Sequence, residues 1–349
     1  MLPDMKKRIG LIGCGKIAQV RHIPELAECP SAEIAGYYNP TRSRAEQMSE
    51  KYGGKVYGSI DEMLSDPSVD AVVVSLANVA HAEVSIKAME AGKDVMCEKP
   101  MATTLEECEA MVAASGRTGR LLMIAQNQRF AMAHAQARRL VEEGAIGKVL
   151  TFRTAFGHSG PENWSIRPGK DTWFFSKDKA AMGVMADLGI HKTDLIQYLL
   201  GSRIVGVSAL LTTLDKTGPD NLPIAVDDNA ICIYRMESGC VGTMTASWTY
   251  YGQEDNSTIL YGTEGILRIY DDPEKPLQMI HRDGTSEVIG TERIQTNDNQ
   301  TRSGIIDAFV DALLTGDAKG LRGADVLPAM KAVFAAIESS RTGKYVGIK

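Results

Sequence analysis

Hydrophobic positions follow two different patterns along the chain, and the first pattern covers residues 1–127. Here short apolar runs alternate with stretches in which apolar residues recur every three or four positions. The runs predict buried strands, and the stretches predict amphipathic helices. The expected strands are 8–13, 32–38, 70–76, 94–97 and 121–125, with helices at 17–27 and 81–91 and further helices opening at Asn39, Ser59 and Thr104. Such alternation is typical of a parallel, doubly wound α/β sheet with helices on both faces.

After residue 127 the pattern changes to several strands with few helices between them. The glycine-containing turns at 237–239 and 263–265 separate consecutive strand-like runs, as in antiparallel hairpins. The expected strands are 148–156, 204–214, 230–236, 241–248, 257–261 and 266–270, with helices at 132–143, 187–200, 305–314 and 325–340. We therefore predict two domains, 1–127 with the parallel sheet and 128–349 with an α+β fold and a large, mostly antiparallel open sheet.

Composition and charge limit the kind of protein that this chain forms. Its 349 residues are 44% hydrophobic and 23% charged, with a formal net charge of −6, which is typical of a globular protein. The chain has no basic run or stripe, so neither nucleic acid nor an anionic membrane is expected as a partner. The six cysteines are scattered without a CxxC pair, and the N-terminus lacks a signal-peptide core. No apolar stretch reaches the roughly 20 residues that cross a bilayer, so we expect a soluble, cytoplasmic protein with reduced thiols.

A glycine-rich turn directly follows the first expected strand. In the run GCGKIA, Gly13 permits a tight turn, Gly15 lets the backbone approach a pyrophosphate, and Ala18 allows close packing of helix and strand. The N–H groups and the positive dipole end of the following helix suit phosphate. The alternative is a tight turn that binds no ligand. The order of strand, glycines and helix favours a dinucleotide-binding turn.

The end of the second expected strand bears on which dinucleotide fits. An NAD-binding chain often carries an acidic residue there, which holds the ribose hydroxyls, but this chain has Asn39. Asn39 does not repel a 2′-phosphate, and Thr41 and Arg42 follow closely enough to bind one. Alternatively, Asn39 caps the next helix, and Arg42 and Arg44 lie on a solvated face. The choice between NAD and NADP stays open, with NAD favoured.

The helix expected from residue 187 carries three polar residues on one face. Asp187, His191 and Asp194 are spaced i, i+4 and i+7, so a helix places them together. The opposite, core-facing stripe is formed by Leu188, Leu195 and Leu199. An imidazole can take the proton of an alcohol as hydride leaves the same carbon, and a carboxylate one turn away can orient the ring. The alternative is that Asp187 caps the helix and His191 is a satisfied buried histidine.

The tripeptide Glu98-Lys99-Pro100 follows the short strand at 94–97. Parallel strands present ligand-binding residues at their carboxyl ends. A lysine there could donate a hydrogen bond to a substrate hydroxyl and stabilise a developing alkoxide. Pro100 suggests a constrained turn that a cis bond would fit. The alternative for this tripeptide is a surface ion pair.

The segment 158–175 is rich in aromatic residues and is interrupted by glycine and proline. Trp164 and Trp173 could stack on sugar faces, and His158 and Arg167 could bind hydroxyls or an acidic group. Alternatively, the segment is an ordered loop whose aromatic residues pack into the domain or a subunit interface. The histidines of the chain are dispersed and no HExxH or CxxC spacing occurs, so no metal site is expected.

Six motifs occur in a fixed order along the chain. They are GCGKIA at 13–18, SLANVAH at 75–81, CEKPMA at 97–102, AQNQRF at 125–130, GVMADLGIHKTD at 183–194 and VDDNA at 226–230. This order resembles the Gfo/Idh/MocA family of NAD(P)-dependent oxidoreductases over nearly the whole chain. The resemblance implies an N-terminal Rossmann domain, a C-terminal substrate-binding α/β domain, and homodimers or homotetramers that associate through the C-terminal sheet.

The resemblance also implies roles for matched residues. Lys99 matches the lysine that contacts substrate beside the nicotinamide, and Asp187 and His191 match the acid and the histidine that complete the catalytic set. Cofactor contacts are expected from Gly13, Gly15, Lys16, Ile17, Ala18, Asn39, Thr41, Arg42, Ser75, Asn78, His81, Glu98, Lys99 and Asn127. Substrate contacts are expected from Lys99, Arg129, His158, Trp164, Arg167, Trp173, Asp187 and His191. The chain departs from the family in reading LAN where TPN is common before His81, and in lacking the acid at the end of the second strand.

These residues favour an NAD(P)-dependent dehydrogenase or reductase that acts on a CH–OH group of a sugar, cyclitol or related polyol, with His191 as the acid and base. One alternative is a redox-neutral glycoside hydrolase that uses bound NAD for a transient oxidation. A second is a regulator that binds NAD(P) without catalysis, which intact Lys99, Asp187 and His191 argue against. A methyltransferase is disfavoured by the EKP motif and the two-domain layout.

Overall fold

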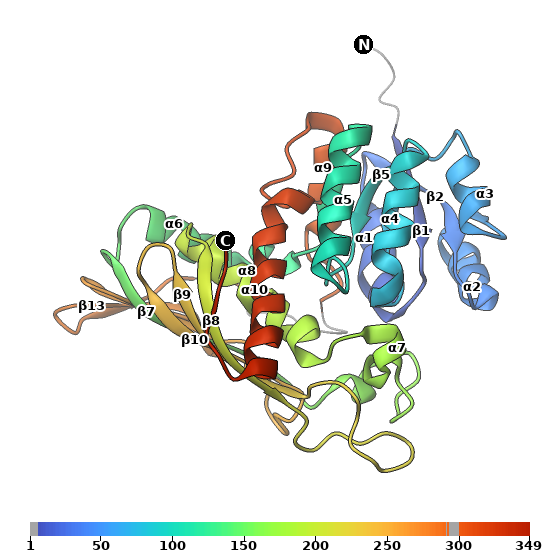
Figure 1. The fold of residues 1–349 in the computed structure, drawn as a ribbon. Helices are drawn as coiled ribbons and strands as arrows, with labels where there is room; N and C mark the ends of the chain where they lie inside the picture. Colours follow the sequence, from blue (N-terminus) through green and yellow to red (C-terminus); the bar gives the residue numbers. More distant parts are fainter. Residues whose placement is uncertain (1–5, 291, 293–299) are drawn as a thin grey trace. The chain divides into compact units, whose positions relative to one another are not determined.

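The computed structural model describes residues 6–290, 292 and 300–349. These residues form two compact units, which divide after Asn127 and again after Leu327 (Figure 1). The described residues 300–327 belong to the first unit. The structure therefore differs here from the predicted division, which assigned all of 128–349 to the second domain.

Helix α9 (Ile305–Thr315) explains why the chain returns to the first unit. It contacts α1 (Ile23–Glu28). The buried Glu25 carboxylate accepts hydrogen bonds from the N–H groups of Ser303 and Ile306 at the start of α9. An acid at a helix N-terminus satisfies unpaired N–H groups and interacts favourably with the helix dipole. Because this contact joins residues 278 positions apart, it leaves no local mark in the sequence.

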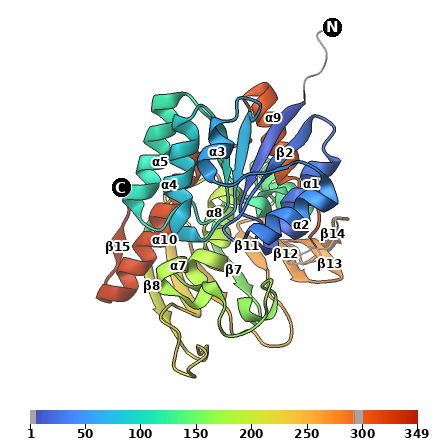
Figure 2. The ribbon, with the colours of Figure 1, turned by 90° about the vertical axis from the view of Figure 1, so that its right-hand side faces the viewer.

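The first unit is a six-stranded parallel sheet with helices packed against it (Figures 1 and 2). Its strand order is β3, β2, β1, β4, β5, β6, and every neighbouring pair is parallel. The bounds are β1 Lys7–Ile12, β2 Ala32–Tyr38, β3 Lys55–Val56, β4 Ala71–Val74, β5 Asp94–Cys97 and β6 Leu122–Ile124, with α2 Arg42–Tyr52, α3 Ile60–Ser65, α4 His81–Glu90 and α5 Leu105–Thr118. All residues of β4 are buried, as expected where helices cover both faces. The predicted doubly wound fold is confirmed, and its topological switch lies between β1 and β4.

Two predicted helix starts in this unit have different outcomes. The helix predicted to open at Thr104 is present and begins with a capping box, in which the Thr104 hydroxyl accepts the N–H of Glu107 and the Glu107 side chain accepts the N–H of Thr104. The prediction that Asn39 caps the second helix is wrong. Helix α2 begins only at Arg42, and the Asn39 side chain instead accepts a hydrogen bond from the N–H of Cys14, with 2.9 Å between nitrogen and oxygen.

The second unit is built on a nine-stranded open sheet. Its strand order is β14, β13, β12, β11, β7, β10, β9, β8, β15, and all neighbours are antiparallel except β7 and β10. The bounds are β7 Val149–Gly157, β8 Ile204–Thr212, β9 Asn229–Met236, β10 Val241–Ser247, β11 Thr258–Gly262, β12 Gly265–Asp272, β13 Lys275–His281, β14 Ser286–Val288 and β15 Val346–Gly347. The helices are α6 Met132–Glu142, α7 Lys177–Ala180, α8 Ile190–Leu200 and α10 Gly323–Thr342, of which α10 begins in the first unit. The predicted mostly antiparallel sheet is confirmed.

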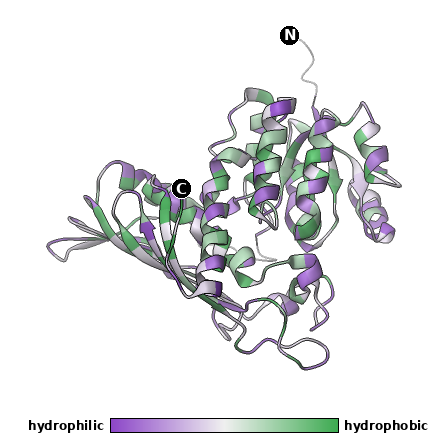
Figure 3. Cartoon of the chain, viewed as in Figure 1, coloured by the Kyte–Doolittle hydropathy of each residue, from purple (hydrophilic) through white to green (hydrophobic). Residues whose placement is uncertain are grey.

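One face of this sheet is covered and the other is exposed. Along β9 the buried residues Cys232 and Tyr234 alternate with the exposed residues Ile231, Ile233 and Arg235. Helices α6 and α8 contact each other, and they contact β12 and β7 on the covered side. Figure 3 shows that the strands of this sheet carry both hydrophobic and hydrophilic residues. The sheet therefore has an apolar core on one side and an open face on the other.

Two further features concern the chain as a whole. Within residues 6–290, 292 and 300–349, none of the helices is both long and apolar enough to span a membrane. All six cysteines are buried, and none of them forms a disulfide.

Candidate active site

The glycine-rich turn after β1 leaves room for a dinucleotide. Gly13 has a φ of +105°, and a Cβ on it would lie 2.3 Å from the carbonyl oxygen of Ser75, so only glycine fits. A Cβ on Gly15 would meet nothing closer than that same oxygen at 3.9 Å, so the space beside Gly15 is open. A helical turn begins directly afterwards at Ala18 and continues into α1. The turn therefore fits a pyrophosphate, whose charge the backbone N–H groups at this helix start would bind.

The loop after β4 is tied to the loop after β5 within the same unit. His81 is 1% exposed, and burial lowers its pKa, so the ring is neutral. Its Nδ1 donates to the carbonyl oxygen of Pro100 at 2.8 Å, and its Nε2 lies 3.2 Å from the carbonyl oxygen of Leu76. The Lys99–Pro100 bond is cis. His81 thus holds the turn that presents Lys99, and Asn78 lies buried in the same loop.

Glu98 uses both carboxylate oxygens within the protein. Oε1 lies 2.7 Å from Nε2 of the fully buried His22, and Oε2 accepts the N–H of Lys99 at 3.0 Å. Burial alone would raise the pKa of Glu98, but His22, Lys99 and Arg21 together lower it to about 2. The carboxylate is therefore ionised and holds the backbone at Lys99. We predicted that Glu98 contacts cofactor, whereas the structure shows these two contacts inside the first unit.

The other predicted cofactor residues of the first unit lie in three places. Lys16, Ile17 and Ser75 are half-buried at the glycine-rich turn and the end of β4. Asn127 instead donates to the side-chain oxygen of Gln300 at 2.8 Å. At the end of β2, Asn39 is buried, while Thr41 and Arg42 are exposed, and Arg42 pairs with Glu46 on the surface of α2 at 2.8 Å.

In the second unit, Asp187 lies in a single π-helical turn, Met185–Gly189, which leads into α8. The start of this turn is capped by Asp227, whose carboxylate accepts the N–H groups of Gly183 and Met185 at 3.0 and 2.8 Å. Asp187 therefore is not the helix cap that we considered as an alternative. Its Oδ2 accepts the indole N–H of the fully buried Trp248 at 3.1 Å. π-turns of this kind occur often at functional sites.

His191 lies one turn after Asp187, and both residues are 7% exposed. The His191 ring packs 5.9 Å from the ring of Phe156, and the ring of His158 packs 6.0 Å from the same phenylalanine. Phe156 therefore brings the two histidines to one region of the second unit. His158 is 7% exposed, and its Nδ1 accepts the N–H of Gly160 at 3.0 Å, which leaves Nε2 as the protonated nitrogen.

Asp194, the third polar residue of this helix, forms an ion pair. Its two oxygens accept bonds from Nε and Nη2 of Arg129 at 2.7 and 2.5 Å, and the guanidinium lies 5.3 Å from the centre of the Tyr198 ring. Bidentate pairs of this kind fix side-chain geometry. Arg129, which we predicted to bind substrate, thus holds α8 to the segment that precedes α6.

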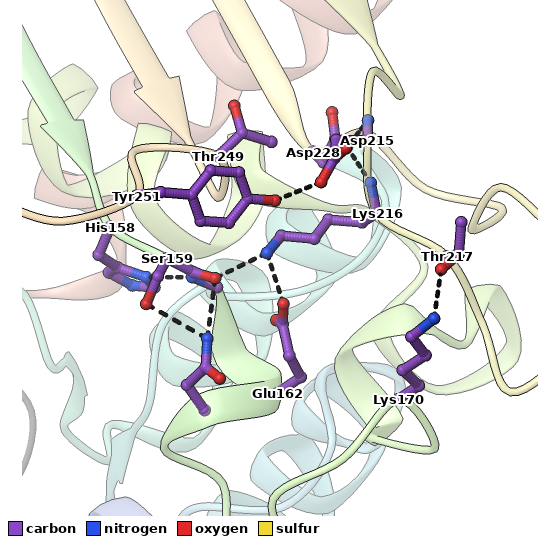
Figure 4. Close-up of polar contacts among 12 residues, drawn as sticks. His158, Ser159, Glu162, Lys170, Asp215, Lys216, Thr217, Asp228, Thr249 and Tyr251 are labelled. Carbon is purple, nitrogen blue, oxygen red and sulfur yellow. Dashed lines mark hydrogen bonds and ion pairs between the residues drawn. The ribbon is translucent and has the colours of Figure 1, made fainter. Parts of the chain in front are cut away.

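The segment 158–175 is anchored at two points to the loop that follows β8 (Figure 4). Lys216 is buried, and its ammonium group donates to the carbonyl oxygen of Ser159 at 2.6 Å and to the carboxylate of Glu162. Lys170 donates to the hydroxyl of Thr217 at 2.8 Å. These contacts hold the segment near its start, at Ser159 and Glu162, and again at Lys170.

The aromatic residues of this segment form a small cluster. Trp173 stacks on Phe174 with 4.0 Å between ring centroids, and Trp164 lies 5.7 Å from Phe174. All three are half-buried, whereas Arg167 is exposed. The structure thus gathers Trp164 and Trp173, but it records no hydrogen bond or ion pair of the Arg167 guanidinium with the described residues.

Three polar residues of these sites were missing from the sequence prediction. His22 and Arg21 lie on the first helical turn of the first unit, and Trp248 follows β10 in the second. Asp227 belongs to the noted VDDNA motif, but nothing local to the sequence marks Trp248 as the partner of a residue 61 positions away. Among the residues that the structure describes, no group of three or more His, Cys, Asp or Glu side chains is arranged to hold a metal ion.

Comparison with protein families gives two matches. Residues 7–126 match the oxidoreductase family with an NAD-binding Rossmann fold, and residues 134–268 match the GFO/IDH/MocA C-terminal domain. The first match lies within the first unit and includes the glycine-rich turn, and the second match lies within the second unit.

Individual proteins and structures are similar to the chain as well. It is 32% identical to levoglucosan dehydrogenase of Pseudarthrobacter phenanthrenivorans over 74% of this chain and 72% of that protein. It is 26% identical to scyllo-inositol 2-dehydrogenase (NAD(+)) of Bacillus subtilis over 96% and 94% of the two chains. A levoglucosan dehydrogenase structure in complex with NADH and levoglucosan matches with a TM-score of 0.86 and 25% identity, covering 99% of this chain and all of that one. The chain therefore belongs to the Gfo/Idh/MocA family of oxidoreductases and is an NAD(P)-dependent enzyme of that family.

Proposed function

We propose that this enzyme transfers hydride between NAD(P) and a secondary alcohol or carbonyl group of a sugar, cyclitol or related polyol. The observation that carries this proposal is the side-chain group of the second unit, where His191 follows an Asp187 held by the Trp248 indole. The relatives named for levoglucosan and inositol support the substrate class.

His191 is proposed to be the acid and base. When bound, the nicotinamide ring supplies the acceptor or donor of hydride. His191 takes the hydroxyl proton as the alcohol is oxidised and returns it in the reverse direction, a role that suits imidazole at neutral pH. Asp187, fixed by the indole N–H of Trp248, orients the imidazole and stabilises the imidazolium. Lys99 donates a hydrogen bond to the reacting oxygen and stabilises the developing alkoxide.

The segment 158–175 is proposed to bind the parts of the substrate that lie away from the reacting carbon. Its half-buried aromatic cluster offers Trp164 and Trp173 as apolar surfaces, as is common in sites for small molecules. His158 is proposed to donate a hydrogen bond to a hydroxyl through Nε2, and Arg167 and Arg129 remain proposed contacts for hydroxyls or an acidic group. The contacts of Lys216 and Lys170 hold the loop that carries these groups against the loop after β8.

Steady-state absorbance at 340 nm tests the reaction. Purified protein is supplied with NAD or NADP and a panel of sugars, cyclitols and polyols, and reduction is followed for many turnovers. Sustained, substrate-dependent reduction supports the proposal. If glycosides are cleaved without net reduction while cofactor stays bound to the purified protein, the enzyme is a redox-neutral hydrolase and the proposal fails.

We also propose that the chain forms a homodimer or homotetramer through the open face of the nine-stranded sheet. Leu210, Ile231 and Ile233 are 59%, 54% and 52% exposed, and Leu210 pairs with Ile231 in register across β8 and β9. An apolar patch of this kind marks a contact surface. The double variant Ile231→Glu/Ile233→Glu is expected to be monomeric by light scattering after gel filtration, whereas Leu314→Glu, at an exposed position near the end of α9, should leave the assembly unchanged. A wild-type monomer would contradict this proposal.

A further inference from the structure

The end of β2 lies directly beside the glycine-rich turn of the first unit. The N–H of Gly13 donates to the carbonyl oxygen of Tyr38 at 2.8 Å, and the N–H of Cys14 donates to Oδ1 of Asn39 at 2.9 Å. In a doubly wound sheet, the residue that ends the second strand faces the adenosine ribose of a bound dinucleotide. The 2′ position of that ribose, which carries a hydroxyl in NAD and a phosphate in NADP, is therefore read by the residues around Asn39.

Asn39 brings no negative charge to this position. Its amide is locked, because Oδ1 accepts the Cys14 N–H and Nδ2 donates to the carbonyl oxygen of Thr41 at 2.9 Å. The side chain is 9% exposed. A carboxylate at this place would bind ribose hydroxyls and repel a 2′-phosphate. The fixed, neutral amide leaves that phosphate without a repelling partner.

Arg44 is a positively charged residue that follows the end of β2 closely. It lies in the first turn of α2 and is half-buried, and its guanidinium makes no hydrogen bond or ion pair with any of the described residues. The N–H of Arg44 donates to the carbonyl oxygen of Thr41 at 3.0 Å, the same oxygen to which Nδ2 of Asn39 donates, so the backbone joins Arg44 to the end of β2. Arg42 differs, because it is exposed and pairs with Glu46 along the surface of the helix.

We propose that the first unit accepts dinucleotides that carry a 2′-phosphate, with Arg44 as the phosphate partner and Asn39 as the residue that permits it. A guanidinium binds phosphate through two parallel hydrogen bonds, and Arg44 has this capacity unused among the described residues. The proposal concerns cofactor choice and deepens the function proposed above. It does not depend on which sugar or polyol is oxidised.

Direct binding measurements on the full chain separate this proposal from the reaction. NADH and NADPH are titrated by nicotinamide fluorescence, and ADP-ribose and 2′-phospho-ADP-ribose are titrated by calorimetry. We expect NADPH to bind within about tenfold of NADH, and the two ADP-ribose compounds to show the same ratio. If NADPH binds more than about 100-fold more weakly than NADH, the proposal is wrong while the dehydrogenase function stands. If neither dinucleotide binds, both fail.

Variants assign the effect to residues. Arg44→Ala should weaken NADPH binding by about tenfold or more and change NADH binding less than twofold. Asn39→Asp keeps the acceptor for the Cys14 N–H and should weaken NADPH by about 30-fold or more while NADH still binds. Lys51→Ala, an exposed cation near the other end of α2, is the matched control and should change neither affinity.

Two outcomes would overturn the assignment. In the first, Arg44→Ala weakens NADH and NADPH equally, although the variant melts at the wild-type temperature. In the second, Arg42→Ala removes the NADPH affinity and Arg44→Ala does not. Either result would show that the guanidinium of Arg44 does not read the 2′ position.

Discussion

In the site proposed above, the turn after β1 offers backbone groups to the cofactor, whereas the π-turn and the start of α8 offer side chains. At Gly13 and Gly15 the decisive property is the missing Cβ, and the partners are neighbouring strand ends of one parallel sheet. At Asp187 and His191 the decisive properties are a buried carboxylate in the π-turn, an imidazole in α8 and an indole just after β10. Cofactor binding at the first site would therefore depend on backbone geometry, whereas proton transfer at the second would depend on particular side chains. Changes in the two units should therefore separate binding from turnover.

The largest effect among changes in the first unit is expected at Lys99, which lies in the cofactor-binding unit but is proposed to act in turnover. Lys99→Ala removes the proposed donor to the reacting oxygen and is expected to lower kcat by about 100-fold or more. NADH affinity should change less than threefold, since the glycine-rich turn is intact. Lys87→Ala, an exposed lysine paired with Asp61 in the same unit, is the control for kcat and affinity. Unchanged kcat in Lys99→Ala would refute its role.

Glu98 tests whether the buried charges of the first unit stabilise the fold. Because the folded pKa of about 2 lies below the ordinary value of 4.5, the ionised carboxylate contributes stability above about pH 4.5 and loses it as pH falls toward 2. Wild type should therefore lose about 3 kcal/mol more unfolding free energy than Glu98→Gln over that interval. Urea denaturation at several pH values measures this. Parallel curves for the two proteins would show that the pair with His22 contributes nothing.

Much of the fold could be predicted because its signals are local. The strands at 32–38 and 94–97 match the structure residue for residue, since each is an apolar run bounded by turn residues. The missed strand β13 contains Pro276 and does not alternate regularly, and β15 has only two residues. Helix α9 was assigned to the wrong unit because the Glu25 contact that holds it is distant in sequence.

Those residues of the site that belong to short sequence motifs could be predicted. The glycines and the Asp187–His191 spacing stand in the sequence as short patterns. The partners of these residues do not. The Trp248 indole and the Asp227 cap depend on how β10 and the loop before β9 pack against the π-turn that leads into α8. Likewise, the side chain of Asn39 could cap a helix, but it lies close to Cys14 and accepts the hydrogen bond of the Cys14 N–H instead.

A smaller effect, on NADH affinity, tests whether the backbone at Gly15 contacts the cofactor. Gly15→Ala is expected to weaken NADH binding by about tenfold or more, because the methyl group occupies the open space where the pyrophosphate approaches. The melting temperature should stay unchanged, since the added Cβ meets no atom closer than 3.9 Å. Gly116→Ala, in α5 with nothing within 4 Å, is the matched control. Normal NADH affinity in Gly15→Ala would mean that the cofactor does not lie there.

The smallest expected effect concerns the indole of the second unit. Trp248→Phe keeps an aromatic ring and removes the N–H that Asp187 accepts, and it should lower kcat about tenfold. NADH affinity should remain at the wild-type value. In an Asp187→Asn background the same change should cost little more, because both variants disrupt one interaction. Fully additive losses in this double-mutant cycle would show that Trp248 acts on something other than Asp187.

The most direct test measures turnover and NADH affinity together in His191→Ala, using any sugar or polyol that the wild-type enzyme oxidises. His281→Ala, an exposed histidine of the same unit that pairs with Glu287, is the control. We expect His191→Ala to lower kcat by about 10²- to 10⁴-fold and to leave the NADH dissociation constant within twofold of wild type. Wild-type turnover in His191→Ala would contradict the assignment of proton transfer to α8, and a lost NADH affinity would contradict the separation of binding from chemistry.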